Sequence, residues 1–148
     1  MSALLTKLRA RRAAGDREGG FTLVELLVVV VIIGVLIAIA IPVYLNYTKG
    51  ARDKSAESDV RSAISTLEQC NSDNGSYPSA MDGAGTMTGC DGQKVKLSDK
   101  TSVTYTSPSG NSSYVLVGSN SLGQQTKYCY DSANGGPVQA LKDPATTC

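Results

Sequence analysis

The sequence contains no histidine and no tryptophan, and it has one phenylalanine among its 148 residues. Without histidine, the chain lacks the side chain that most often serves as a general base near neutral pH and as a nitrogen ligand of metals. It also lacks a glycine-rich phosphate-binding loop after a predicted strand. These absences disfavour an enzyme, and we expect no catalytic residue, no metal site and no cofactor.

A strong excess of charge of one sign is absent as well, because 14 basic and 13 acidic residues leave a formal net charge of +1. Such a balance by itself indicates neither nucleic acid nor an acidic substrate as the partner. The charges are unevenly placed, since residues 1–20 hold five basic and two acidic side chains, a net charge of +3, which leaves −2 for the rest. A basic segment before an apolar span stays in the cytoplasm, so the later part of the chain is expected outside.

The large apolar residues are concentrated in one run, Leu26–Leu45, which contains no charged residue. At about 1.5 Å of rise per residue, a helix of this length spans roughly 30 Å, the thickness of a bilayer's hydrocarbon core. Glu25 stands at the front edge of the run, where an unpaired carboxylate in lipid costs a few kcal/mol and therefore requires a partner. A secretory signal has a shorter apolar region and a small-residue cleavage site, so an uncleaved transmembrane anchor is the simpler alternative.

The hexapeptide Gly20-Phe21-Thr22-Leu23-Val24-Glu25, placed between a basic segment and a long apolar run, resembles the class III leader of type IV prepilins. Pseudopilins of type II secretion and competence systems share this leader. The resemblance implies that a prepilin peptidase cleaves after Gly20 and that Phe21 becomes an N-methylated amino terminus. It further implies that Glu25 pairs with the terminal amine of a neighbouring subunit during filament assembly.

Two residues interrupt the apolar helix, Gly34 and Pro42. Proline has no N–H to donate to the carbonyl of Ala38 and crowds that carbonyl, so a kink or a local loosening of the helix is expected. The resemblance adds that this region of pilins loses helicity when subunits enter a filament. Transmembrane helices also tolerate both residues without a functional reason.

Beyond the apolar run, the pattern becomes that of a helix with one apolar face. Val60, Ala63, Ile64 and Leu67 recur at helical spacing, and polar residues occupy the other faces. The sequence Asn74-Gly75 is typical of a helix end. We therefore predict one helix over residues 21–73, whose second half packs on a small head domain.

After this helix, residues 79–93 are predicted to form a loop, and short strands are predicted over residues 94–97, 102–106, 113–118 and 126–131. The predicted fold is α+β and type IV pilin-like: one long N-terminal helix with its C-terminal half packed on a small antiparallel sheet. Four tyrosines of the head are expected in its core, namely Tyr105, Tyr114, Tyr128 and Tyr130.

The four cysteines, Cys70, Cys90, Cys129 and Cys148, all follow the apolar run, and they allow three disulfide connectivities. We expect Cys70–Cys90 to join the helix end to the next loop and Cys129–Cys148 to join the last predicted strand to the tail. The second pair also agrees with the disulfide-bounded C-terminal segment of many pilins. Zinc is the competing interpretation, but the sequence has no CxxC spacing.

Weaker signals leave three further possibilities open. The aspartates are scattered and match no calcium-loop template, although some pseudopilins bind calcium in the head. Lys94, Lys96 and Lys100 are able to contact DNA phosphates, but lysines also protect a sheet edge from aggregation. Asn74 and Asn111 each begin a glycosylation sequon, a motif short enough to arise by chance.

The resulting division is a cleaved basic leader (1–20), a membrane and filament-core segment (21–45) and a globular head (46–148). The expected function is that of the major pilin of a type IV pilus, and the alternative is a pseudopilin of a secretion or DNA-uptake system. A membrane-anchored binding protein that never polymerises is a third class. Expected partners are other copies of the chain, the prepilin peptidase, the assembly platform, minor pilins and the membrane. The precursor is expected in the cytoplasmic membrane with its head outside, and the mature chain in an extracellular filament.

Overall fold

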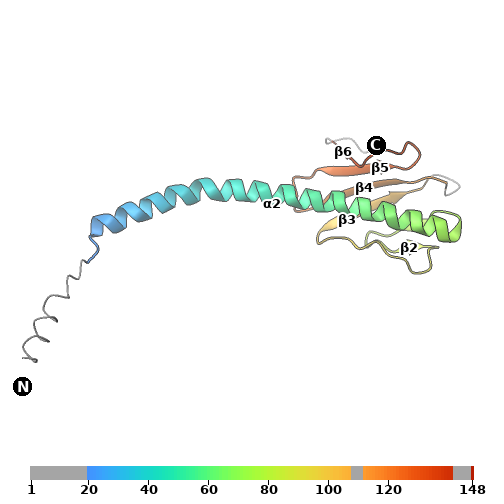
Figure 1. Cartoon of the computed structure of the whole chain (residues 1–148), viewed down its shortest axis with the longest axis horizontal. Helices are drawn as coiled ribbons and strands as arrows, with labels where there is room; N and C mark the ends of the chain where they lie inside the picture. Colours follow the sequence, from blue (N-terminus) through green and yellow to red (C-terminus); the bar gives the residue numbers. More distant parts are fainter. Residues whose placement is uncertain (1–19, 108–111, 142–147) are drawn as a thin grey trace, which may run out of the picture. The chain divides into compact units, whose positions relative to one another are not determined.

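The computed structural model describes residues 20–107, 112–141 and 148. Within these residues, one long helix is followed by six strands: α2 (Leu23–Asn74), β1 (Ala80–Met81), β2 (Met87–Thr88), β3 (Thr101–Thr106), β4 (Val115–Asn120), β5 (Lys127–Asp131) and β6 (Gln139–Leu141). The helix agrees with the prediction to within two residues at each end. The chain divides into two compact units, with the boundary between Ile41 and Pro42. Figure 1 shows the course of the chain.

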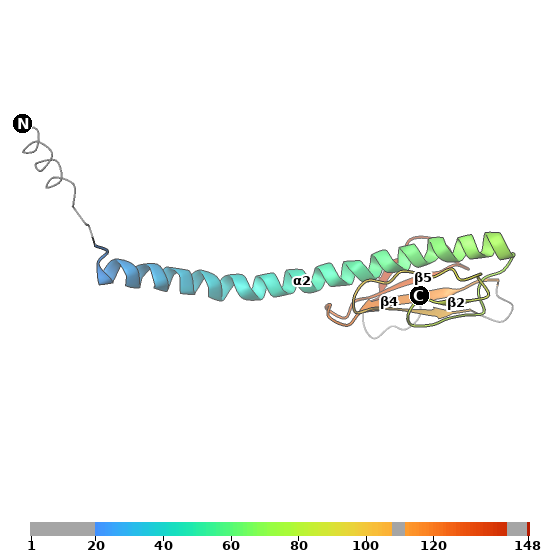
Figure 2. The same cartoon turned by 90° about the horizontal axis from the view of Figure 1, so that it is seen from below.

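Within the second unit, the carboxyl-terminal part of α2 covers one face of the four-stranded sheet (Figure 2). The predicted apolar face is confirmed, because Val60, Ala63 and Leu67 are fully buried there. The helix ends at Gly75, whose φ of 73° continues the chain in the left-handed region. Its N–H donates to the carbonyl of Asn71 at 2.8 Å, and the helix end is thereby closed.

The larger sheet is an antiparallel meander with the strand order β3-β4-β5-β6. Burial alternates along β4, so that Leu116, Gly118 and Asn120 are buried while their neighbours are partly exposed. This alternation follows from the pleat of a sheet with one covered face. The predicted strands over residues 102–106, 113–118 and 126–131 correspond to β3, β4 and β5, and these predictions are confirmed.

Two predictions for the segment between the helix and this sheet are wrong. The expected loop over residues 79–93 contains the antiparallel pair β1–β2, and residues 94–97 form no strand beyond one isolated bridge between Thr86 and Lys94. Backbone N–H groups in and directly after residues 94–97 donate hydrogen bonds to groups outside the sheet. The N–H of Val95 donates to the carbonyl of Gly85 at 2.9 Å, and the N–H of Ser98 donates to the Asp59 carboxylate at 2.7 Å.

Strand β6 was not predicted; it pairs with β5 in the register Cys129↔Gln139 and Lys127↔Leu141. The segment before β6 contains a turn over residues 132–134 and a bend at Gly136. Asp131 organises the first of these turns, because its side chain accepts hydrogen bonds from Ala133 and Asn134 at 2.9 and 2.6 Å.

The predicted tyrosine core is present. Tyr114 and Tyr128 are buried, and Tyr105 and Tyr130 pack against the same core. The Tyr114 ring is central, with ring centroids of Tyr77, Tyr105 and Tyr130 at 4.8, 6.0 and 5.9 Å. Aromatic area therefore supplies much of the core of a head that is poor in large aliphatic residues.

Both disulfides of the structure join the cysteines in the expected pairs. Cys70 at the end of α2 is bonded to Cys90, with a Cα–Cα distance of 5.5 Å. Cys129 in β5 is bonded to Cys148, with a Cα–Cα distance of 5.8 Å. One bridge ties Cys90 to the end of α2 and the other ties Cys148 to β5, and Cys70, Cys90 and Cys129 are fully buried.

Candidate assembly site at the amino-terminal helix

The helix begins with a reciprocal set of hydrogen bonds between Thr22 and Glu25. The Thr22 hydroxyl oxygen accepts from the Glu25 N–H at 3.2 Å, while the Thr22 N–H and hydroxyl both donate to Glu25 Oε2 at 2.9 Å. This capping box satisfies N–H groups that have no partner within the helix. Glu25 was predicted only to make contacts between subunits, and Thr22 was not predicted as a cap, although a T-x-x-E spacing before an apolar run is typical of one.

The apolar segment after this cap is uncovered. Every residue from Gly20 to Tyr47 is exposed, and the helix is long and apolar enough to cross a membrane. Monomeric soluble proteins rarely expose apolar surface of this extent, so another apolar phase has to cover it. A bilayer and the same segments of other subunits both meet this requirement.

The predicted cleavage position lies immediately before the capped helix. The Phe21 side chain is 88% exposed, and no heavy atom lies near the position that a Cβ on Gly20 would take. Among the described residues, nothing therefore crowds the predicted cleavage position. The rest of the predicted leader, residues 1–19, lies outside the described residues.

The structure keeps the helix unbroken through both predicted kink residues, Gly34 and Pro42. Pro42 nevertheless removes one backbone donor from the helix, so the turn that includes Ala38 has one hydrogen bond fewer than its neighbours. The kink and the loss of helicity in a filament stay predictions.

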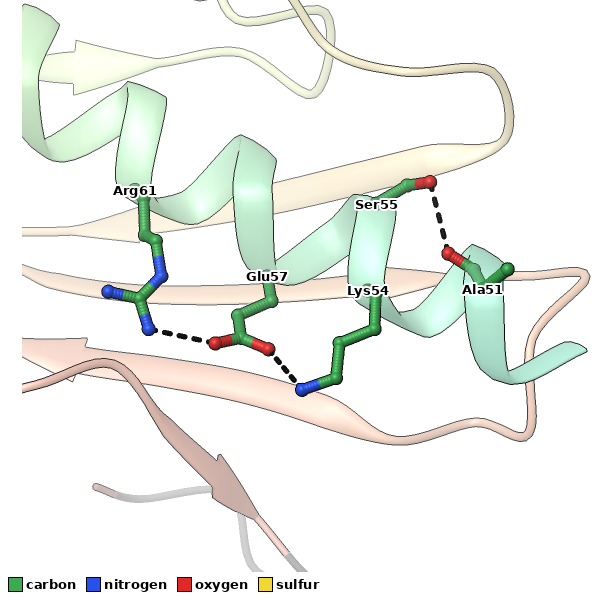
Figure 3. A network of polar contacts seen from close by, with 5 residues as sticks. All are labelled: Ala51, Lys54, Ser55, Glu57 and Arg61. Atoms are coloured by element: carbon green, nitrogen blue, oxygen red, sulfur yellow. Dashed lines mark hydrogen bonds and ion pairs between the residues drawn. The ribbon is translucent and has the colours of Figure 1, made fainter.

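A charged network lies on the exposed surface of the second half of α2 (Figure 3). Glu57 accepts from Lys54 Nζ at 2.6 Å and from Arg61 Nη2 at 2.8 Å. The hydrogen bond from Arg61, followed by that from Lys54, lowers the pKa of the Glu57 carboxyl. Since the two cations are well exposed, solvent screens the network and its contribution to stability is small.

The remaining predicted sites find less support in the geometry. Lys94 and Lys96 line one cavity together with Thr101, and Lys100 is not among its lining residues. All three lysines are exposed. Among the described residues, no group of three or more Cys, Asp or Glu side chains is arranged to hold a metal ion.

Comparison with known proteins bears on the same amino-terminal segment. Residues 15–41 match the family described as the prokaryotic N-terminal methylation motif. The chain carries a type IV pilin-like amino terminus. Together with the long apolar helix and the small antiparallel head, this motif confirms the prediction of a type IV pilin-like α+β protein.

The relatives fall into two groups. The type II secretion system core protein G of Pectobacterium carotovorum subsp. carotovorum is 40% identical over 70 residues, which cover 47% of this chain and 45% of the relative. A fimbrial protein of Pseudomonas aeruginosa is 55% identical over 52 residues, covering 35% and 33%. The type IV major fimbrial protein FimA of Dichelobacter nodosus is 52% identical over 52 residues, covering 33% of each. The chain thus spans less than half the length of these relatives, and no solved structure matches it significantly.

Proposed function

We propose that this pilin-like chain is the major, repeated subunit of a type IV pilus. The observation that carries the proposal is an apolar helix of membrane-spanning length that is wholly exposed and begins at a capped carboxylate, Glu25. Such a helix is suited to two successive environments. It lies in the bilayer before assembly, and it packs against the helices of other subunits afterwards.

In the proposed mechanism, hydrolysis of the Gly20–Phe21 peptide bond removes the basic leader and leaves a new amine on Phe21. This amine, which N-methylation leaves basic, is protonated near neutral pH. Glu25 Oε2 is engaged by Thr22, whereas Oε1 has no hydrogen-bond partner among the described residues. Oε1 is therefore free to accept from the amine of a neighbouring subunit, and pairing two charges in a low dielectric favours one stagger between subunits.

The two disulfides favour a pilus over a pseudopilus. A long surface fibre exposes each head to extracellular proteases, and the two bridges tie Cys90 to the end of α2 and Cys148 to β5. The second candidate is a pseudopilin, because the alignments with secretion system G proteins reach 71 residues and those with fimbrial proteins reach 52.

The processing step is tested with Gly20→Glu, and Gly20→Ala is the matched control because it keeps a small residue before the cut. We expect Gly20→Glu to remain a membrane-bound precursor, while Gly20→Ala is processed. Immunoblotting of membrane and sheared surface fractions reports both. Recovery of Gly20→Glu in filaments at its mature mass would contradict the proposal.

Pilus and pseudopilus are separated by a deletion strain. If the chain is a major pilin, the strain loses surface filaments in electron micrographs and keeps its secreted proteins. If the chain is a pseudopilin, the same strain retains its filaments and accumulates secretion substrates inside the cell envelope.

A further inference from the structure

One large apolar side chain is exposed away from the amino-terminal helix. Among the described residues after Tyr47, Leu122 alone combines a large apolar side chain with high exposure, at 46%. It lies in the connection between β4 and β5. A single exposed leucine is ordinary, so the position of this connection is what matters.

The β4–β5 connection is fixed to the helix where the apolar segment ends. The Asp53 carboxylate, which is 4% exposed, accepts from the Gln124 N–H at 3.0 and 3.1 Å. The Gln124 side chain donates to the carbonyl of Asn46 at 3.3 Å. A Cβ on Gly123 would overlap the Asp53 carboxylate, so glycine permits this close approach. Leu122 is therefore held beside the first helical turns after Leu45.

Exposed aromatic and basic side chains lie on the helical turns beside the β4–β5 connection. Tyr44 and Tyr47 are 66% and 76% exposed, and Lys49 and Arg52 are exposed with no ion pair among the described residues. Lys100 joins them through the backbone, since its carbonyl accepts from the Ser121 N–H at 3.0 Å.

Acidic groups nearby do not cancel these three cations. Asp53 is buried and bonded to the backbone of Gln124. Glu57 is shared between Lys54 and Arg61. Asp99 is exposed next to Lys100 and offsets one positive charge. The exposed side chains at this level thus retain a net positive charge.

We propose that an interfacial collar, made of Tyr44, Tyr47, Lys49, Arg52, Lys100 and Leu122, binds the anionic phospholipid headgroups of the membrane before assembly. Tyrosine is enriched at membrane–water interfaces, and basic side chains there are attracted to anionic lipids. From Leu45 to Arg52 the helix rises by about 10 Å. The long side chains of these residues add to this reach, so together they span the headgroup layer. The collar would hold the head against the bilayer by its β4–β5 end.

The bilayer is the favoured occupant because the collar continues directly from the apolar segment that the membrane covers. This inference rests on the membrane-inserted precursor of the proposed function. A second copy of the chain is the other possible cover of Leu122, and the experiment below distinguishes the two.

The sequence has no tryptophan, so Leu122→Trp supplies a single fluorescent reporter. Ala133→Trp is the matched control, because Ala133 is exposed and follows Asp131, which pairs with Val115 at the opposite end of the sheet from Asn120. Each full chain is reconstituted into vesicles of phosphatidylethanolamine with phosphatidylglycerol, or of phosphatidylcholine alone. Resistance to alkaline extraction first verifies insertion in the same samples, so failure of insertion is seen separately.

In the anionic vesicles, we expect blue-shifted emission from Leu122→Trp and quenching by lipids brominated near the headgroup, with neither effect for Ala133→Trp. Adding Lys49→Gln and Arg52→Gln should reduce the quenching to its level in phosphatidylcholine. Equal exposure of the two tryptophans in inserted protein would overturn the collar. So would a blue shift of Leu122→Trp that rises with protein density without lipid quenching, because a second copy would then cover the site.

Discussion

Gly118 of β4 lies directly beneath Val60 of α2, so close that a Cβ at position 118 would overlap the Val60 side chain. The same Cβ would also lie 3.3 Å from the carbonyl oxygen of Ala56. Glycine at this position therefore sets how closely the helix approaches the sheet. This close contact and the packed tyrosines together form the core of the head.

Gly118→Ala is expected to destabilise the head by about 1–3 kcal/mol, the usual cost of overpacking a closely packed core. Gly83→Ala is the matched control, because open space surrounds that glycine and its φ is not positive. Urea unfolding of both variants, followed by circular dichroism, measures the difference. An unchanged midpoint for Gly118→Ala would mean that the helix moves away from the sheet at little cost.

Glu25 has two roles that variants can separate. Thr22→Ala removes the side-chain cap, which costs about 0.5–2 kcal/mol of helix stability, but it leaves the carboxylate in place. Glu25→Ala removes the charge and the acceptor of the two hydrogen bonds from Thr22, but the Thr22 hydroxyl can still accept from the backbone N–H of residue 25. If the carboxylate pairs with a neighbouring amine, Glu25→Ala is processed yet assembles poorly, whereas Thr22→Ala assembles nearly normally. Filament yield from strains that express each variant alone checks this, and equal yields would assign Glu25 to capping only.

Tyr114 is expected to make the stability of the head depend on alkaline pH. Burial, and then the hydrogen bond to Glu68 at 2.8 Å, raise the pKa of the Tyr114 hydroxyl above its ordinary value near 10. The unfolded chain therefore loses this proton at a lower pH than the folded chain. The stabilisation is complete below about pH 10 and is lost as the pH rises further, by up to about 1.4 kcal/mol per pH unit.

Tyr114→Phe should accordingly flatten the dependence of unfolding free energy on pH above about 10. The exposed Tyr44 provides the control, and Tyr44→Phe should leave the slope unchanged. Denaturant unfolding at several alkaline pH values measures the slopes. A slope for Tyr114→Phe equal to that of the unmodified chain would show that this hydroxyl ionises equally in both states.

The disulfide between Cys129 and Cys148 should matter more for the head than for processing. Cys129→Ser and Cys148→Ser are each expected to cost about 2–5 kcal/mol, comparable with the whole stability of a small domain. Leader cleavage should continue, while the head becomes sensitive to limited proteolysis and fewer filaments are exported. Non-reducing peptide mapping of the unmodified protein checks the pairing, and a Cys129–Cys70 or Cys129–Cys90 peptide would contradict it.

Elements that depend on local spacing were predictable from the sequence. The apolar run, the helical repeat through Val60 and Leu67, and the stop at Asn74-Gly75 are properties of neighbouring residues in the chain. The leader motif around Gly20 and Phe21 is equally local. The Thr22–Glu25 cap was not predicted, but it is local too, because a threonine followed three residues later by a glutamate is the pattern of a capping box.

Tertiary structure alone decided the pairing of short segments and the fate of buried polar groups. The pattern of residues 94–97 predicts a strand, but no ladder forms there. The N–H of Val95 donates to the carbonyl of Gly85, and the N–H of Ser98, directly after the segment, donates to the Asp59 carboxylate. β6 exists because β5 lies beside it, and nothing in its three residues specifies that partner. From its local sequence, Asp53 would be expected to be an exposed helical residue. It is buried because the β4–β5 connection packs on it and Gln124 donates its N–H to the carboxylate. Each outcome depends on contacts between residues far apart in sequence, whose energies a local pattern does not contain.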